Sequence, residues 1–255
     1  MFTVSRTILL LVSLSLCNRL WAHQETQTAV FDQSAVAAVA DMLRSSGWSP
    51  SRLPTDVTAT GTITFFKADT SEERAISFEA IGSQFFKSTI PSDGSSLIIS
   101  RGQAVVVTPN GNQQLSFDAA LWMKPFLFPF FQLPKTPVGL KYLGTEMVGG
   151  VLAKRIEIAT VAGSPAAAVG TITIWISTTN SLPVQVEYAR IADDGYVTPI
   201  HCVLTYSDYR EIQGVLVPFR QVESIDGMHF YSLQLDRVHV NQGLSESDFA
   251  LPVIK

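Results

Sequence analysis

The chain has 255 residues, of which 46% are hydrophobic and 16% are charged, and its formal net charge is −4. A chain of this length can bury a sizeable core, either as one β-rich domain or as two small ones. Its acidic balance and few Lys and Arg residues argue against nucleic acid and against anionic lipid surfaces as partners, because both need a basic protein face.

Residues 1–22 have the features of a secretory signal peptide. Arg6 supplies the positive start, an apolar run follows from Ile8 to Leu16, and Ala22 is a small residue at which cleavage could occur. The apolar run is too short to span a bilayer comfortably. We therefore expect an exported protein.

Cleavage after Ala22 would leave residues 23–255 and remove two arginines, which changes the formal charge from −4 to −6. An alternative is a lipid anchor at Cys17, although Leu16 stands where such a signal normally has a small residue. Cys202 is the one cysteine left after cleavage, so no disulfide can form within the mature chain. We expect this thiol to be a small buried hydrophobe.

One amphipathic helix is predicted near the start of the mature chain. Asp32 or Ser34 can cap its N-terminus, and Gly47 can end it in a left-handed conformation. Within it, apolar side chains recur at helical spacing at Val36, Val39, Ala40 and Leu43. After Pro50 the spacing of hydrophobic residues changes from the helical period to the alternation that is typical of strands.

The pattern of most of the remaining chain predicts short strands, roughly ten or eleven of them, with no helix-length segment between one strand and the next. This pattern predicts an α+β, β-dominated fold, in which a strongly curved antiparallel sheet is covered by a few short helices. A sheet of this size would curl into a closed barrel or an open half-barrel. Hairpin turns are predicted at Arg101-Gly102, Asp194-Gly195 and Gln213-Gly214, and a bulge near Asp236-Arg237.

The chain contains no internal repeat. Its one linker-like segment, from Ala162 to Gly170, is rich in small residues and is interpreted as a hairpin loop. We therefore predict a single domain over residues 23–255.

A strongly hydrophobic, proline-rich segment, LWMKPFLFPFFQLP, occupies residues 121–134. It could be part of the core, a membrane contact or the cover of an apolar cavity. Its three prolines forbid a continuous long helix, and the intervals between them are too short to cross a bilayer. Because it interrupts the strand pattern, we interpret it as a hinged lid, with core packing as the alternative. The predicted lid residues are Trp122, Phe126, Phe128, Phe130 and Phe131.

Apolar residues fill both faces of several predicted strands, which indicates an interior that side chains fill incompletely. Phe65, Phe85 and Trp175 are candidate walls of that cavity, with plain core packing as an equal alternative.

Motifs for catalysis and for metal binding are missing from the sequence. It has no GxSxG elbow, phosphate loop or dinucleotide fingerprint. His201 and Cys202 are neighbours on one strand and point to opposite faces, and His229 and His239 lack the spacing of metal ligands. We therefore expect that the protein is not an enzyme and has no catalytic residue, no metal and no cofactor. An enzyme that uses His201 or His229 in a cavity is the alternative.

The order of these parts resembles the LolA-like family of periplasmic lipoprotein carriers and outer-membrane lipoprotein-sorting proteins. The resemblance rests on Tyr206 to Tyr209 (YSDY), on Val217 to Phe219 after the Gly214 turn, on the ending from Val240 to Pro252, and on the hairpin from Leu97 to Gly111. It covers most of residues 30–255, through diffuse patterns of strand and turn.

The resemblance implies an unclosed half-barrel under a helical lid, with an apolar cavity for the acyl chains of lipoproteins or other amphiphiles. It also implies a monomer that could exchange cargo with membrane-bound donor and acceptor proteins. The carriers have an arginine in the strand before that hairpin, which latches the lid, whereas Gly82, Ser83 and Gln84 stand here. An envelope scaffold with a filled barrel, which docks partners on its outside, is the alternative.

Overall fold

The computed structural model describes residues 31–47, 54–67, 69–82, 84–115, 139–159, 171–191 and 199–253. The elements in these ranges are α2 (Gln33–Ser45), β1 (Asp56–Lys67), β2 (Thr70–Ile81), β3 (Phe85–Ile90), β4 (Ser95–Ser100), β5 (Gln103–Thr108), β6 (Gly111–Leu115), β7 (Gly139–Val148), β8 (Val151–Ala159), β9 (Ile172–Ser177), β10 (Pro183–Ile191), β11 (Pro199–Ile212), β12 (Val215–Ile225), β13 (Met228–Val240) and the 3₁₀ helix η3 (Glu246–Phe249). The predicted signal peptide and Cys17 lie outside the described residues.

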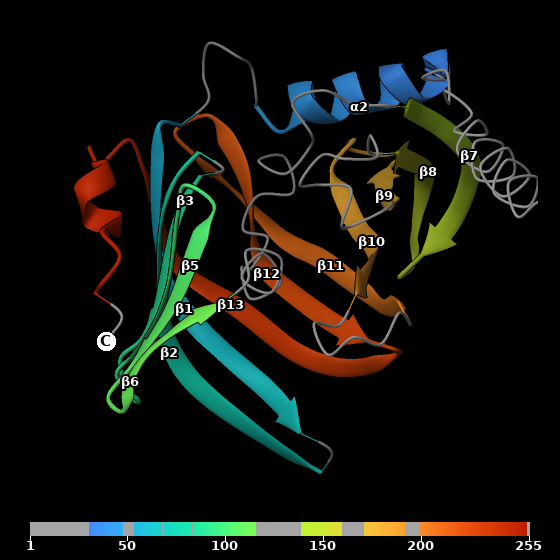
Figure 1. Ribbon diagram of the computed structural model, residues 1–255. Coiled ribbons are helices and arrows are strands. Elements are labelled where there is room, and N and C mark those ends of the chain that lie inside the picture. The colour runs from blue at the N-terminus through green and yellow to red at the C-terminus, as the bar shows by residue number, and fades with distance from the viewer. Residues whose placement is uncertain are drawn as a thin grey trace, which may run out of the picture.

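All thirteen strands belong to one antiparallel sheet, in the order β6-β5-β4-β3-β2-β1-β13-β12-β11-β10-β9-β8-β7. The chain begins in the middle of the sheet with β1, proceeds outward to the edge strand β6, resumes at the opposite edge with β7 and returns to the middle with β13. The sheet is strongly curved, with β2–β6 on one side, β7–β10 on the other and β11–β13 between them (Figure 1). The predicted antiparallel meander under few helices is thus confirmed.

The predicted bulge in β13 is also confirmed. Thr60 pairs with Arg237 while Gly61 pairs with Leu235, so Asp236 is the extra residue. At this point the two backbones approach so closely that a Cβ on Gly61 would lie 2.2 Å from the carbonyl oxygen of Gln234. Only glycine fits there, and the bulge adds to the bend of the central strands.

Two of the three predicted hairpin turns lie within the described residues, and both are confirmed. In Arg101-Gly102 and in Gln213-Gly214 both residues have positive φ, as a two-residue hairpin turn requires. Asp194-Gly195 lies outside the described residues. The structure has more strands than predicted because Gly82 splits one long strand-like stretch, from Ile76 to Ile90, into β2 and β3, and because the polar edge strand β6 carries little apolar signal.

The helix α2 begins and ends where the sequence predicts. The Asp32 carboxylate caps it by accepting a hydrogen bond from the Ser34 backbone N–H at 2.7 Å. Gly47 follows its C-terminus with φ of +75°. The helix is tied to one sheet edge by the Asp32 N–H, which donates to the Leu140 carbonyl of β7. It is tied to the middle of the sheet by the Leu216 N–H of β12, which donates to the Ser46 carbonyl.

The buried face of α2 differs from the predicted stripe. Ala35, Ala38 and Met42 are buried. Val39 and Leu43 of the predicted stripe are partly buried against the same core, whereas Val36 is 43% exposed and Ala40 is exposed. The small alanines allow the helix to approach the sheet closely, and this contact rotates the helix relative to its most hydrophobic stripe.

The sheet has two faces with different covers. We call the face on which α2 packs the inner face, and the opposite one the outer face. The main core lies on the inner face and includes Cys202, which is fully buried as expected for a small hydrophobe. A smaller cluster on the outer face joins Phe85 and Ile98 to Phe249 of η3. The C-terminal segment therefore covers part of the outer face.

Asp56 anchors the chain where β13 ends. Its carboxylate is buried and accepts hydrogen bonds from the backbone N–H groups of Gln242 at 2.7 Å and Gly243 at 3.0 Å. Its own carbonyl accepts from the Asn241 N–H at 3.0 Å. These bonds hold the end of β13 against the start of β1, at the pairing that joins the two halves of the sheet.

We expect Asp56→Ala to lower the free energy of unfolding by about 1–3 kcal/mol, because two backbone donors lose their acceptor in a partly buried place. Urea unfolding followed by circular dichroism measures this. Asp236→Ala, which removes an exposed carboxylate from the same strand pair, is the matched control and should change the value by less than about 0.5 kcal/mol. Equal effects of the two substitutions would contradict this role of Asp56.

Candidate functional site

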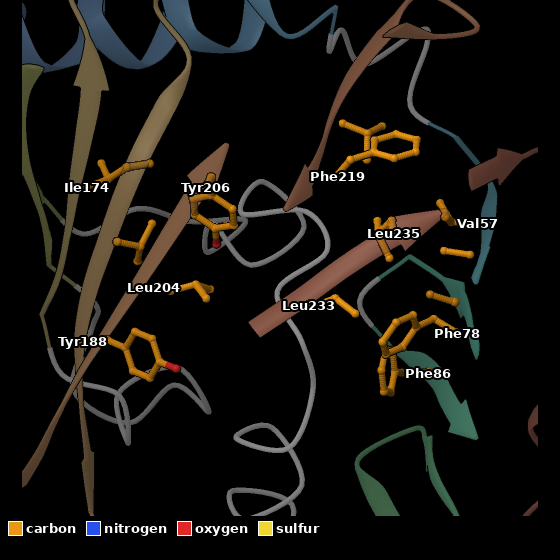
Figure 2. Close-up of a cluster of buried hydrophobic side chains, with 14 of the residues drawn as sticks. Val57, Phe78, Phe86, Ile174, Tyr188, Leu204, Tyr206, Phe219, Leu233 and Leu235 are labelled. Atoms are coloured by element: carbon orange, nitrogen blue, oxygen red, sulfur yellow. The ribbon is translucent and has the colours of Figure 1, made fainter. Parts of the chain in front are cut away.

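The candidate site is the inner face of the curved sheet. Its apolar side chains follow one another from strand to strand because alternate residues of each strand point to the same side. Figure 2 shows members of this face from both halves of the sheet, among them Ile174 and Leu204 on one side and Phe78, Phe86 and Leu233 on the other. Among the described elements, α2 is the helix that packs on this face. One helix of thirteen residues is a small cover for a face that crosses the whole sheet.

The structure places the three predicted wall residues on two different faces. Phe65 packs against the inner-face core and pairs with Tyr231 across β1 and β13. Phe85 lies on the outer face, with its ring 5.7 Å from that of Phe249. Trp175 alternates with the inner-face residues of β9 and also faces outward, where its indole N–H donates to Glu146 at 2.6 Å. The structure therefore brings only Phe65 of the three to the face under α2.

The five predicted lid residues fall in residues 116–138, outside the described residues. The described strands before and after this range are β6 and β7, the two edges of the sheet.

A buried acidic group lies in the middle of the inner face. The Tyr188 hydroxyl donates to the Glu223 carboxylate at 2.5 Å, and Tyr231 pairs with Glu223 across β12 and β13. All three residues are at most 5% exposed. Burial, followed by the neighbouring Glu223 charge, raises the pKa of Tyr188 and of Tyr231 above the ordinary range. Both hydroxyls therefore remain protonated at neutral pH and can act as hydrogen-bond donors.

Two further polar side chains on this face have no hydrogen-bond partner among the described residues. Gln221 is fully buried, and neither its amide nitrogen nor its amide oxygen is hydrogen-bonded within the described part of the chain. The same holds for the hydroxyl of Tyr206, which faces Gln221 across β11 and β12. Leaving a buried polar group unpaired costs about 1–3 kcal/mol, so such groups are rare in folded proteins.

Sequence reasoning missed Gln221 and Glu223, and it assigned no binding role to Tyr206. A signal was present in the alternation of β12, VLVPFRQVESI. Gln221 and Glu223 have the same parity as Val217 and Phe219, which are core residues. Two polar residues in phase with an apolar strand face indicate buried polar groups.

The histidines of the alternative enzyme hypothesis do not form a site with the inner face. His201 is exposed, with its Nε2 atom 3.5 Å from Glu187, and His229 is exposed beside Ser224. Over the described residues, no group of three or more His, Cys, Asp or Glu side chains is arranged to hold a metal. No helix in the same ranges is both long enough and apolar enough to cross a membrane.

No family model matches the sequence, and no curated protein matches it either. Similar folds occur among solved structures. An outer-membrane lipoprotein-sorting protein domain from Vibrio parahaemolyticus is 14% identical, with a TM-score of 0.60 over 85% of this chain and 96% of that one. A LolA superfamily protein from Nitrosomonas europaea is 12% identical, with a TM-score of 0.58 over 85% of this chain and 97% of that one.

A DUF1329 family protein from Desulfovibrio piger is 14% identical and has a TM-score of 0.61, again over 85% of this chain and 97% of that one. At sequence identities this low, structural similarity is evidence for a shared fold and not for a shared activity. For the fold, it confirms the resemblance found in the pattern of strands and turns: this chain has the LolA-like fold.

Proposed function

We propose that the protein is a soluble, exported, non-enzymatic carrier or binder of acyl chains, which it holds against the inner face of the sheet. The observation that carries this proposal is the inner face itself, an apolar surface that extends over the curved sheet under one described helix. Each methylene that leaves water contributes about 0.8 kcal/mol, so even partial shielding of an acyl chain gives substantial binding.

The LolA-like fold supports this proposal, since one structure with this fold is named as an outer-membrane lipoprotein-sorting domain. The acyl chains of lipoproteins or of other amphiphiles are accordingly the proposed cargo. The periplasm is the proposed compartment, and membrane-bound donor and acceptor proteins are the proposed exchange partners. Phe65 is the proposed wall residue, because it is the predicted one that packs with the inner face.

The segment from 121 to 134 is the proposed lid. Its aromatic side chains would supply the apolar cover that α2 alone does not provide. Trp122, Phe126, Phe128, Phe130 and Phe131 are the residues proposed to contact the acyl chain.

An envelope scaffold is the second candidate function, and exposed apolar residues at one end of the sheet favour it. Phe66, Phe230 and Met228 are 37%, 38% and 71% exposed, at the ends of β1 and β13. Clustered apolar groups on a surface can mark the contact with a partner protein. In this case the inner face would be filled by the protein's own side chains.

Protein purified from the periplasm should retain lipid in native mass spectrometry. After lipid removal, added lipopeptide or fatty acid should raise the melting temperature, because a ligand that binds only the folded state stabilises it. An envelope scaffold would carry no lipid and would melt at the same temperature with or without these compounds.

The double substitution Phe126→Ser and Phe130→Ser should weaken acyl binding at least about tenfold, since two aromatic groups are lost from the proposed cover. Displacement of a fluorescent fatty-acid probe measures the affinity. Phe66→Ser, at an exposed phenylalanine of β1, is the matched control and should leave the affinity unchanged. If the control weakens binding as much as the double substitution, residues 121–134 are not the cover.

A further inference from the structure

We propose that Gln221 and Tyr206 form a polar subsite within the inner face, which binds the uncharged head of an amphiphile. The head would carry both a carbonyl acceptor and an N–H or O–H donor. This inference rests on the proposed acyl-binding function and specifies which acyl compounds the protein selects.

The geometry places the two side chains together. Tyr206 on β11 and Gln221 on β12 are direct cross-strand partners, so their side chains leave the sheet side by side on the same face. Gln221 is 0% exposed and Tyr206 is 4% exposed, and both belong to the apolar centre of the sheet. Figure 2 shows the Tyr206 ring among the apolar residues, with its hydroxyl directed away from its strand.

The unpaired atoms define the chemistry of a ligand. The Gln221 amide offers donors on Nε2 and an acceptor on Oε1, and the Tyr206 hydroxyl offers one donor and one acceptor. None of these atoms has a hydrogen-bond partner within the described residues. A pure hydrocarbon would leave all of them unpaired. A head with a carbonyl and an N–H or O–H group would satisfy the amide on both sides.

Glu223 adds selectivity against anions. It follows Gln221 by two residues on β12 and therefore faces the same side of the sheet. Its carboxylate already accepts the Tyr188 hydroxyl, and its charge contributes to the raised pKa of Tyr206, after burial and Tyr209 and Tyr231. A ligand carboxylate bound beside this second buried carboxyl group would lose its own hydration in a poorly solvated place, which is costly for a charged group. Esters with free hydroxyls and primary amides thus fit better than free fatty acids.

The test compares three compounds with the same acyl chain: 1-monooleoylglycerol, oleamide and oleate. Each displaces a fluorescent acyl probe from delipidated protein. We expect at least one neutral compound to bind about tenfold more tightly than oleate, as one added hydrogen-bonded pair would give. Whichever neutral compound binds more tightly shows whether an ester with hydroxyls or an amide is the preferred chemistry.

In Gln221→Leu we expect the affinity for the neutral compounds to fall about tenfold and that for oleate to stay the same. The melting temperature should stay equal or rise, because an unpaired buried amide is replaced by an apolar group of similar size. A structural role for Gln221 would lower it instead. Tyr206→Phe should act in the same direction. Gln185→Leu on β10, whose side chain donates to Glu187, is the matched control and should leave the three affinities unchanged.

The outcomes separate this inference from the proposed function. If all three compounds bind equally and Gln221→Leu changes nothing, acyl binding stands and the polar subsite is wrong. If neither the acyl probe nor any of the three compounds binds wild-type protein, acyl binding itself is wrong, and the subsite is wrong with it.

Discussion

The structure depends on one constraint: a large curved sheet with an apolar inner face must cover that face without closing on itself. Closure would pair β6 with β7 and remove both edges, but these strands stay at opposite ends of the sheet. The helix α2 covers part of the inner face. Backbone hydrogen bonds join its two ends to Leu140 at one edge of the sheet and to Leu216 near the middle. Its alanine-rich face permits close contact, and the rest of the inner face needs another cover, for which residues 121–134 are proposed.

Local sequence signals were sufficient for much of this fold. The Asp32 cap, the Gly47 stop, the two glycine turns and the β13 bulge each depend on residues close together in the chain. The rotation of α2 could not be read in the same way. It is decided by contact with strands distant in sequence, and that contact buries Ala35, Ala38 and Met42 more deeply than Val39 and Leu43 of the stripe that periodicity reveals. The split at Gly82 was missed because only Ser83 and Gln84 separate it from Phe85 and Phe86, where the apolar strand pattern resumes.

The site was harder to predict than the fold because it depends on which face each residue occupies. Phe85 and Trp175 are aromatic, buried and in strands, yet the pairing register directs them outward to Phe249 and Glu146. Aromatic content alone cannot distinguish the two faces. Strand parity could have done so, and it would have found Gln221 in phase with the core of β12. The informative residues of the inner face are therefore its few polar ones, since apolar residues also line the outer face.

The central pairing of β1 with β13 has a consequence for how the protein assembles. The two halves of the sheet are built from hairpins between neighbours in sequence, whereas β1 and β13 join residues far apart, such as Val57 and Val240. Contacts at such separation form slowly because a long loop must close first. During synthesis β1 emerges long before β13, so one side of β1 remains an unpaired strand edge that can join to another chain. The pairing of β13 thus completes the sheet and also removes the open edge of β1.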